Sequence, residues 1–137
     1  MCIRDSINLI KGQGNDVAFL TPTIEQYEQA INAFPYRRAD ERQTNLDNMQ
    51  AAVSSRAPSL QQHLQTARQK ANTENIDIQN LELYDVKIEV KYNLDNFKGG
   101  NAIFIFRDSE GNLHRLGASA IYHIDGAWYV LNKFFWL

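Results

Sequence analysis

The sequence predicts an α+β fold, with N-terminal helices packed on a curved antiparallel sheet of about four strands. Apolar residues recur every three to four positions up to Asn72 and every second position beyond Asn75. Two turn motifs, at residues 109–111 and 125–126, join the later segments as hairpins. With 137 residues, 7 Gly, 3 Pro and 1 Cys, the chain fits one domain and excludes collagen-like, disordered and disulfide-scaffold proteins.

The first predicted helix covers residues 22–34. Either Thr21 is its N-cap with Pro22 at the first helical position, or Thr23 is its N-cap with Gln26 completing a capping box. Its apolar residues at helical spacing are Ile24, Tyr27, Ile31 and Phe34.

Residues 38–57 and 59–72 carry one narrow apolar stripe that Pro58 interrupts. Since proline removes a backbone donor and clashes with the preceding turn, we expect a kink or two successive helices. The basic residues are spread around the helix without interleaved aromatic residues, which favours a solvated face over nucleic-acid binding. They are Arg37, Arg38, Arg42, Arg56, Arg68 and Lys70.

The first predicted strand covers residues 81–92, and a polar connection ending at residues 99–100 follows it. Apolar and charged residues alternate along the strand, as is typical of one buried and one solvated face. The residues predicted to be buried are Tyr84, Val86, Ile88, Val90 and Tyr92.

The remaining predicted strands cover residues 101–108, 112–124 and 127–136. The Asp-Gly turn places Tyr122 opposite Tyr129 and His123 opposite Trp128. Continuing this register places Arg115 opposite Trp136 and Gly117 opposite Phe134, with the sheet curving at residues 117–119.

This register divides the side chains between two faces. One face receives the helices, and the other is too apolar to be only hydrated, so we expect a second copy, a protein partner or a further segment of chain on it. Its apolar members include Ile103, Ile105, Ile121, Trp128, Val130 and Phe134. The candidate ligand- or partner-binding residues are Tyr122, His123, Trp128, Phe134, Arg115 and Trp136.

The sequence contains no motif that assigns catalysis. Of the three histidines, His63 has no metal-ligand partner at helical spacing and His114 falls at a hairpin end. We therefore expect no catalytic residues, no metal and no cofactor. The net charge of −2 argues against nucleic-acid binding, and no apolar run is long enough for a membrane span.

Residues 17–137 are predicted to form a single domain behind a poorly ordered or artefactual leader at residues 1–16. The opening residues 1–6 resemble an adapter-derived read-through at the front of gene models assembled from environmental sequence. On that interpretation the true N-terminus is missing, so the location is cytoplasmic as the sequence is written and extracytoplasmic if an export signal was lost with that N-terminus. Cys2, the single cysteine, allows no internal disulfide.

The final hairpin, Asp125-Gly126-Ala127-Trp128-Tyr129, resembles the Asp-Gly-x-Trp-Tyr hairpin that ends many members of the NTF2-like superfamily. The chain is also similar to small uncharacterised α+β proteins of Bacteroidota-type bacteria with a terminal Gly-x-Trp-Tyr strand. The resemblance implies a cone that holds a small molecule, catalyses isomerisation or cyclisation, or serves for dimerisation and protein binding. No catalytic pattern of the superfamily matches this sequence residue by residue.

We therefore expect a bacterial, non-enzymatic domain that associates with itself or with a protein partner through the second sheet face. The alternative is a pocket for a small apolar ligand, or a modest enzyme, with Tyr84, Tyr92, Tyr122 or His123 at its mouth. A third interpretation is an accessory domain of a longer polypeptide.

Overall fold

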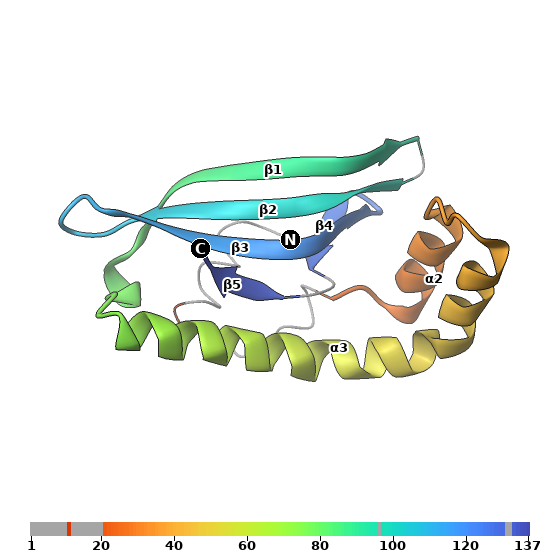
Figure 1. The fold of residues 1–137 in the computed structure, drawn as a ribbon, viewed down its shortest axis with the longest axis horizontal. Coiled ribbons are helices and arrows are strands. Elements are labelled where there is room, and N and C mark those ends of the chain that lie inside the picture. The colour runs from red at the N-terminus through yellow and green to blue at the C-terminus, as the bar shows by residue number, and fades with distance from the viewer. Residues whose placement is uncertain (1–10, 12–20, 96, 131–132) are drawn as a thin grey trace.

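The structure is a computed structural model that describes residues 11, 21–95, 97–130 and 133–137. It confirms the α+β class, because helices pack with an antiparallel sheet (Figure 1). The rest of the predicted leader and residues 17–20 lie outside the described residues. The elements are α2 (Ile24–Ala33), α3 (Ala39–Thr73), the short 3-10 helix η2 (Ile78–Asn80), β1 (Glu82–Leu94), β2 (Phe97–Arg107), β3 (Leu113–Ile124), β4 (Ala127–Val130) and β5 (Phe134–Trp136).

Helix α2 begins with the predicted capping box. The Gln26 backbone N–H donates to Thr23 Oγ1 at 3.3 Å, and the Thr23 N–H donates to Gln26 Oε1 at 3.0 Å. These bonds satisfy two N–H groups that have no partner within the helix. The helix ends at Ala33 because Pro35 restricts Phe34 to extended backbone.

Helix α3 is continuous over 35 residues, so the division into helices 38–57 and 59–72 is wrong. Pro58 lies inside it and deprives the Ser54 carbonyl of its usual helical donor. The cost of about 3 kcal/mol is offset by the packing of the second half of the helix. The helix changes direction in its first half, as expected for a bend on the N-terminal side of a proline (Figure 1).

The second half of α3 supplies one wall of the main core. Leu60, Leu64, Ala67 and Ala71 are 0, 1, 4 and 0% exposed. Trp136 of β5 packs against this wall, and its indole Nε1 donates to the Ala67 carbonyl at 2.7 Å. This bond joins the last strand to the helix.

The sheet has the order β1-β2-β3-β4, and β5 pairs with β3. Both predicted hairpin turns are confirmed. Gly111 has φ +87°, and Asp125 and Gly126 have φ +50° and +81°, as a type I′ turn requires. The predicted pairs of Tyr122 with Tyr129 and of His123 with Trp128 are present.

Strand β2 begins at Phe97, so the prediction that residues 99–100 form a connection is wrong. Both glycines lie inside the strand where a side chain has no room. A Cβ on Gly100 would lie 1.9 Å from the Glu89 carbonyl oxygen, and one on Gly99 would lie 2.9 Å from the Tyr122 ring. Glycine here permits close strand approach and does not mark a turn.

A β-bulge in β3 divides the last predicted strand into β4 and β5. Ser119 and Ala120 occupy the position opposite Asn101, whose side chain accepts the Ala120 N–H at 3.2 Å. The register of β5 with β3 differs by one residue from that of β4 with β3. Gly117 is therefore opposite Phe135.

This shift corrects two predicted pairs, because Trp136 lies opposite Leu116 and not Arg115, and Phe134 lies opposite Ala118 and not Gly117. The ring that lies over Gly117 is that of Phe135 and not of Phe134. A Cβ on Gly117 would lie 2.6 Å from the Phe135 ring. Within the described residues, no helix is long and apolar enough to cross a membrane.

Candidate functional site

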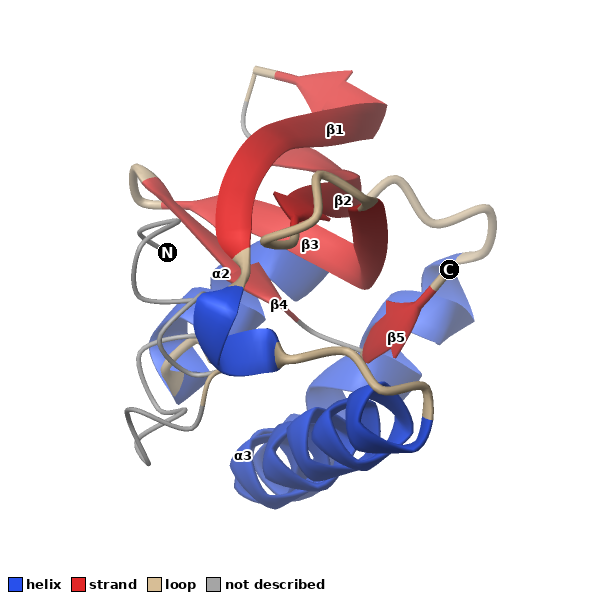
Figure 2. Cartoon of the chain, turned by 90° about the vertical axis from the view of Figure 1, so that its left-hand side faces the viewer, coloured by secondary structure: helices blue, strands red, loops and turns tan. Residues whose placement is uncertain are grey.

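Strand β1 forms an edge of the sheet and pairs only with β2 among the described strands. Figures 1 and 2 both place it at the margin of the sheet, away from α3. The prediction that its apolar row is buried is wrong, except for Val86, which is partly buried. The large apolar side chains that are exposed are Tyr84 (59%), Ile88 (45%), Val90 (48%), Tyr92 (37%) and Leu94 (43%).

The middle of β1 is a regular strand between two register irregularities. These irregularities lie between Leu83 and Asp85 and between Val90 and Tyr92. Over residues 85–90 the strand therefore presents backbone N–H and C=O groups on its outer side, a template for another strand. The charged residues of this segment and its border, Asp85, Lys87, Glu89 and Lys91, are all exposed.

The predicted second sheet face is largely interior. The β3 bulge contributes an extra residue, so Ala118 and Ile121 both turn toward the core. Their partners, Phe134 and Val130, follow because opposed residues share a face. The members of this face that are buried within the chain are Ile121 (0%), Val130 (0%), Phe134 (3%), Trp136 (8%) and Ile105 (5%).

Phe134 and Trp136 are therefore core residues. Arg115 is exposed and does not lie opposite Trp136. His123 and Trp128 form the predicted cross-strand pair, with ring centroids 5.1 Å apart in an edge-to-face arrangement. Tyr122 lies on the other side of the same strand and packs against α2.

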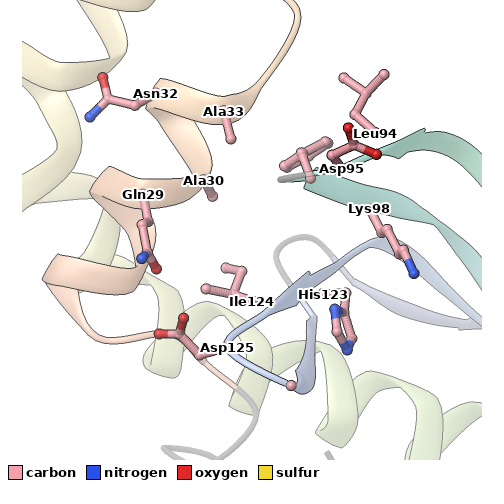
Figure 3. Close-up of a pocket in the computed structure, with 12 residues that line it drawn as sticks. Gln29, Ala30, Asn32, Ala33, Leu94, Asp95, Lys98, His123, Ile124 and Asp125 are labelled. Carbon is pink, nitrogen blue, oxygen red and sulfur yellow. The ribbon is translucent and has the colours of Figure 1, made fainter.

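A cavity of about 600 Å³ lies between α2, the β1–β2 turn and the β3–β4 turn (Figure 3). His123 and Lys98 lie on one side of it and Asp125 below α2. Asp95, Lys98 and Asp125 are exposed, and both signs of charge are present. The cavity is an open polar groove.

A second cavity of about 380 Å³ lies between α2, α3 and β3. The aromatic side chains of Tyr27, Tyr36 and Tyr122 line it together with Arg56. The Nε atom of Arg56 is buried and has no hydrogen-bond partner among the described residues. Sequence reasoning assigned Arg56 to the solvated face, although its position one turn before Leu60 places it at the border of the apolar stripe.

An aromatic cluster closes one side of this second cavity and holds α2 on the sheet. Phe34 contacts Tyr92 and Phe97 with ring centroids 5.0 and 5.5 Å apart, and Phe97 contacts Tyr122 at 5.0 Å. Burial raises the pKa of the Tyr122 hydroxyl above its usual value. The neutral phenol is therefore favoured, and it can donate to an acceptor in the cavity.

The four residues predicted at a pocket mouth separate in the structure. Tyr122 lines the second cavity and Tyr92 contacts Phe34, which also lines it. His123 lines the polar groove. Tyr84 lies at the other end of β1, with the Arg107 guanidinium 5.4 Å from its ring.

Sequence reasoning missed one polar pair, at the β2–β3 hairpin. His114 Nε2 lies 2.8 Å from Asp108 Oδ2, and the Glu110 and Asn112 backbone N–H groups donate to Asp108 Oδ1. These hydrogen bonds, the one with His114 foremost, lower the pKa of Asp108 to about 2. The Asp108 carboxylate organises the turn. In the sequence, the pair is indicated only by a polar residue on each side of a Gly-containing turn.

Across the described part of the chain, no group of three or more His, Cys, Asp or Glu side chains is placed to hold a metal ion. Comparison of the chain with protein-family models, with curated proteins and with solved structures finds no match in any of the three. The NTF2-like resemblance therefore stays a prediction.

Proposed function

We propose that the chain is a non-enzymatic protein-interaction domain and that β1 is its binding edge. The observation that carries this proposal is the exposure of Ile88 and Val90, 45 and 48%, on a strand whose outer edge meets no other described strand. Backbone groups that face no other described strand, beside apolar side chains, favour the addition of an extended strand, although the Val86 N–H already donates to Asp85 Oδ1 at 2.8 Å.

In strand addition, the backbone and the side chains make different contributions to binding. Main-chain hydrogen bonds along residues 85–90 supply affinity, and the alternating side chains of that segment select the partner. The proposal keeps the expected class of function but moves the surface, because much of the second sheet face lies inside the core.

A labelled synthetic peptide that copies residues 82–94 tests the proposal by fluorescence anisotropy. We expect saturable binding to the intact chain and its loss in Ile88→Lys, because the lysine charge opposes apolar contact along the edge. Leu113→Lys is the matched control, since Leu113 is 48% exposed and lies outside β1. Equal binding to both variants, or none to the wild type, would contradict the proposal.

A second candidate function is the binding of a small organic anion in the cavity lined by Arg56. The unpartnered Nε of Arg56 and the phenol of Tyr122 favour a carboxylate attached to an aromatic body. Benzoate is a suitable probe. We expect benzoate to raise the melting temperature of the wild type and of Arg37→Gln, an exposed-arginine control, but not of Arg56→Gln. Equal shifts in all three would remove this candidate.

A further inference from the structure

We infer that the partner of β1 is a second copy of this chain, paired antiparallel with it about a twofold axis at Ile88. This inference rests on the proposed function and names the partner. The two sheets then join edge to edge into one continuous sheet. In Figures 1 and 2 no described element lies beyond β1 to block a second copy.

The charges of β1 are complementary to themselves in this arrangement. With the axis at Ile88, each residue faces the one equally far on the other side of Ile88 in the second copy. Lys87 therefore faces Glu89, and Asp85 faces Lys91. The twofold axis repeats each pair, so two Lys87–Glu89 pairs form within the regular segment and two Asp85–Lys91 pairs form at its border, and no charge faces its like.

Neighbouring registers lose this complementarity. An axis at Lys87 sets that lysine against itself and Asp85 against Glu89. An axis at Glu89 sets that glutamate against itself and Lys87 against Lys91. A register slip of one residue places the axis between two residues. Each apolar side chain then faces a charged one, because side chains alternate along a strand. The charges that protect an edge from indiscriminate pairing thus select one register.

The apolar side chains agree with the same register. Val86 faces Val90, and Ile88 faces its own copy. Val90 and Ile88 are 48 and 45% exposed in the single chain, so pairing covers apolar surface that the helices leave open. The regular segment at residues 85–90 supplies the outward backbone groups for this pairing, because both bulges lie outside it.

Disulfide trapping tests the position of the axis. In a Cys2→Ser background, Ile88→Cys places two thiols on opposed residues, whose Cα atoms lie about 4.5–5.5 Å apart, within disulfide range. Val86→Cys is the matched control, because the axis separates its two copies by roughly 14 Å. We expect mild oxidation to crosslink Ile88→Cys and not Val86→Cys. Equal crosslinking, or the reverse order, would overturn the inference.

Charge reversal tests the register in solution by sedimentation velocity. Lys87→Glu and Glu89→Lys each bring like charges together, so each is expected to self-associate at least about tenfold more weakly than the wild type. Mixed in equal amounts, the two variants face each other with opposite charges throughout, and a heterodimer is expected. A mixture that stays monomeric would overturn the inference.

A wild-type chain that stays monomeric up to about 1 mM would also overturn the inference. If the peptide of residues 82–94 still binds to that monomer, the proposed function survives and only the second copy is excluded as partner. If neither association occurs, both fail.

Discussion

Replacement of Ile121 and of Ile88 by threonine applies one chemical change to a buried and to an exposed strand position. The two residues are 0 and 45% exposed. The sequence pattern alone places them the other way round, with Ile88 in the buried row and Ile121 on the free face. The comparison therefore separates the observed register from the predicted one, and threonine keeps the β-branched shape that strands favour.

The expected magnitudes follow from burial. Isoleucine to threonine removes the equivalent of about two buried carbon groups, worth about 0.8 kcal/mol each. At Ile121 the new hydroxyl is also left without a partner, which adds about 1–3 kcal/mol, so the total is about 3–5 kcal/mol. At Ile88 the hydroxyl stays in water and the loss is below about 1 kcal/mol.

Urea unfolding at micromolar protein, where self-association is negligible, measures both free energies of unfolding. We expect a difference of about 2–5 kcal/mol, with Ile121→Thr the less stable variant. Equal losses, or a larger loss for Ile88→Thr, would show that the bulge in β3 is misplaced and would refute the reasoning.

Gly100→Ala is expected to cost about 3 kcal/mol or more in urea unfolding, because its Cβ would lie 1.9 Å from the Glu89 carbonyl oxygen; a neutral result would contradict the close approach. Trp136→Phe is expected to cost about 1 kcal/mol through the lost bond to Ala67, and no loss would argue against that contact. The pKa of Asp108 is lowered from 3.8 to about 2 by hydrogen bonding, so its contribution to stability is complete above pH 4 and lost as pH falls through 2. NMR titration of its carboxyl carbon should show a midpoint near 2, and one near 4 would contradict the pairing.

The turns and caps could be predicted from the sequence because their chemistry is local. The capping box at Thr23 and the Asp-Gly turn each depend on residues within a few positions of one another. The cross-strand pairs next to the turn, such as His123 with Trp128, follow from it directly. Local rules therefore sufficed for the fold class.

The faces of the sheet could not be predicted in the same way. One extra residue at Ser119–Ala120 reverses the side of Ile121, and no residue type in that segment signals a bulge. Gly99 and Gly100 look like a turn in the sequence, because the close approach that requires them comes from β1 and β3.

The exposure of β1 also depends on tertiary structure. Its alternation of apolar and charged residues fits a strand with one buried face, but α3 packs along β5 and leaves Ile88 and Val90 uncovered. A period-two pattern shows that one face of a strand is apolar, but it does not show which element packs on that face. Arg56 is the converse case, a charged residue whose Nε atom is buried by the packing of the helices.

Amide hydrogen exchange along β1, followed by NMR at two protein concentrations, tests the open edge most directly. In dilute solution the outward amides of residues 85–90 should exchange fast, apart from that of Val86, which donates to Asp85 Oδ1, and the amides bonded to β2 should exchange slowly. At high concentration the fast amides should become protected. Uniform protection in dilute solution would mean that the edge is already covered, and fast exchange at every concentration would mean that no second copy pairs with it.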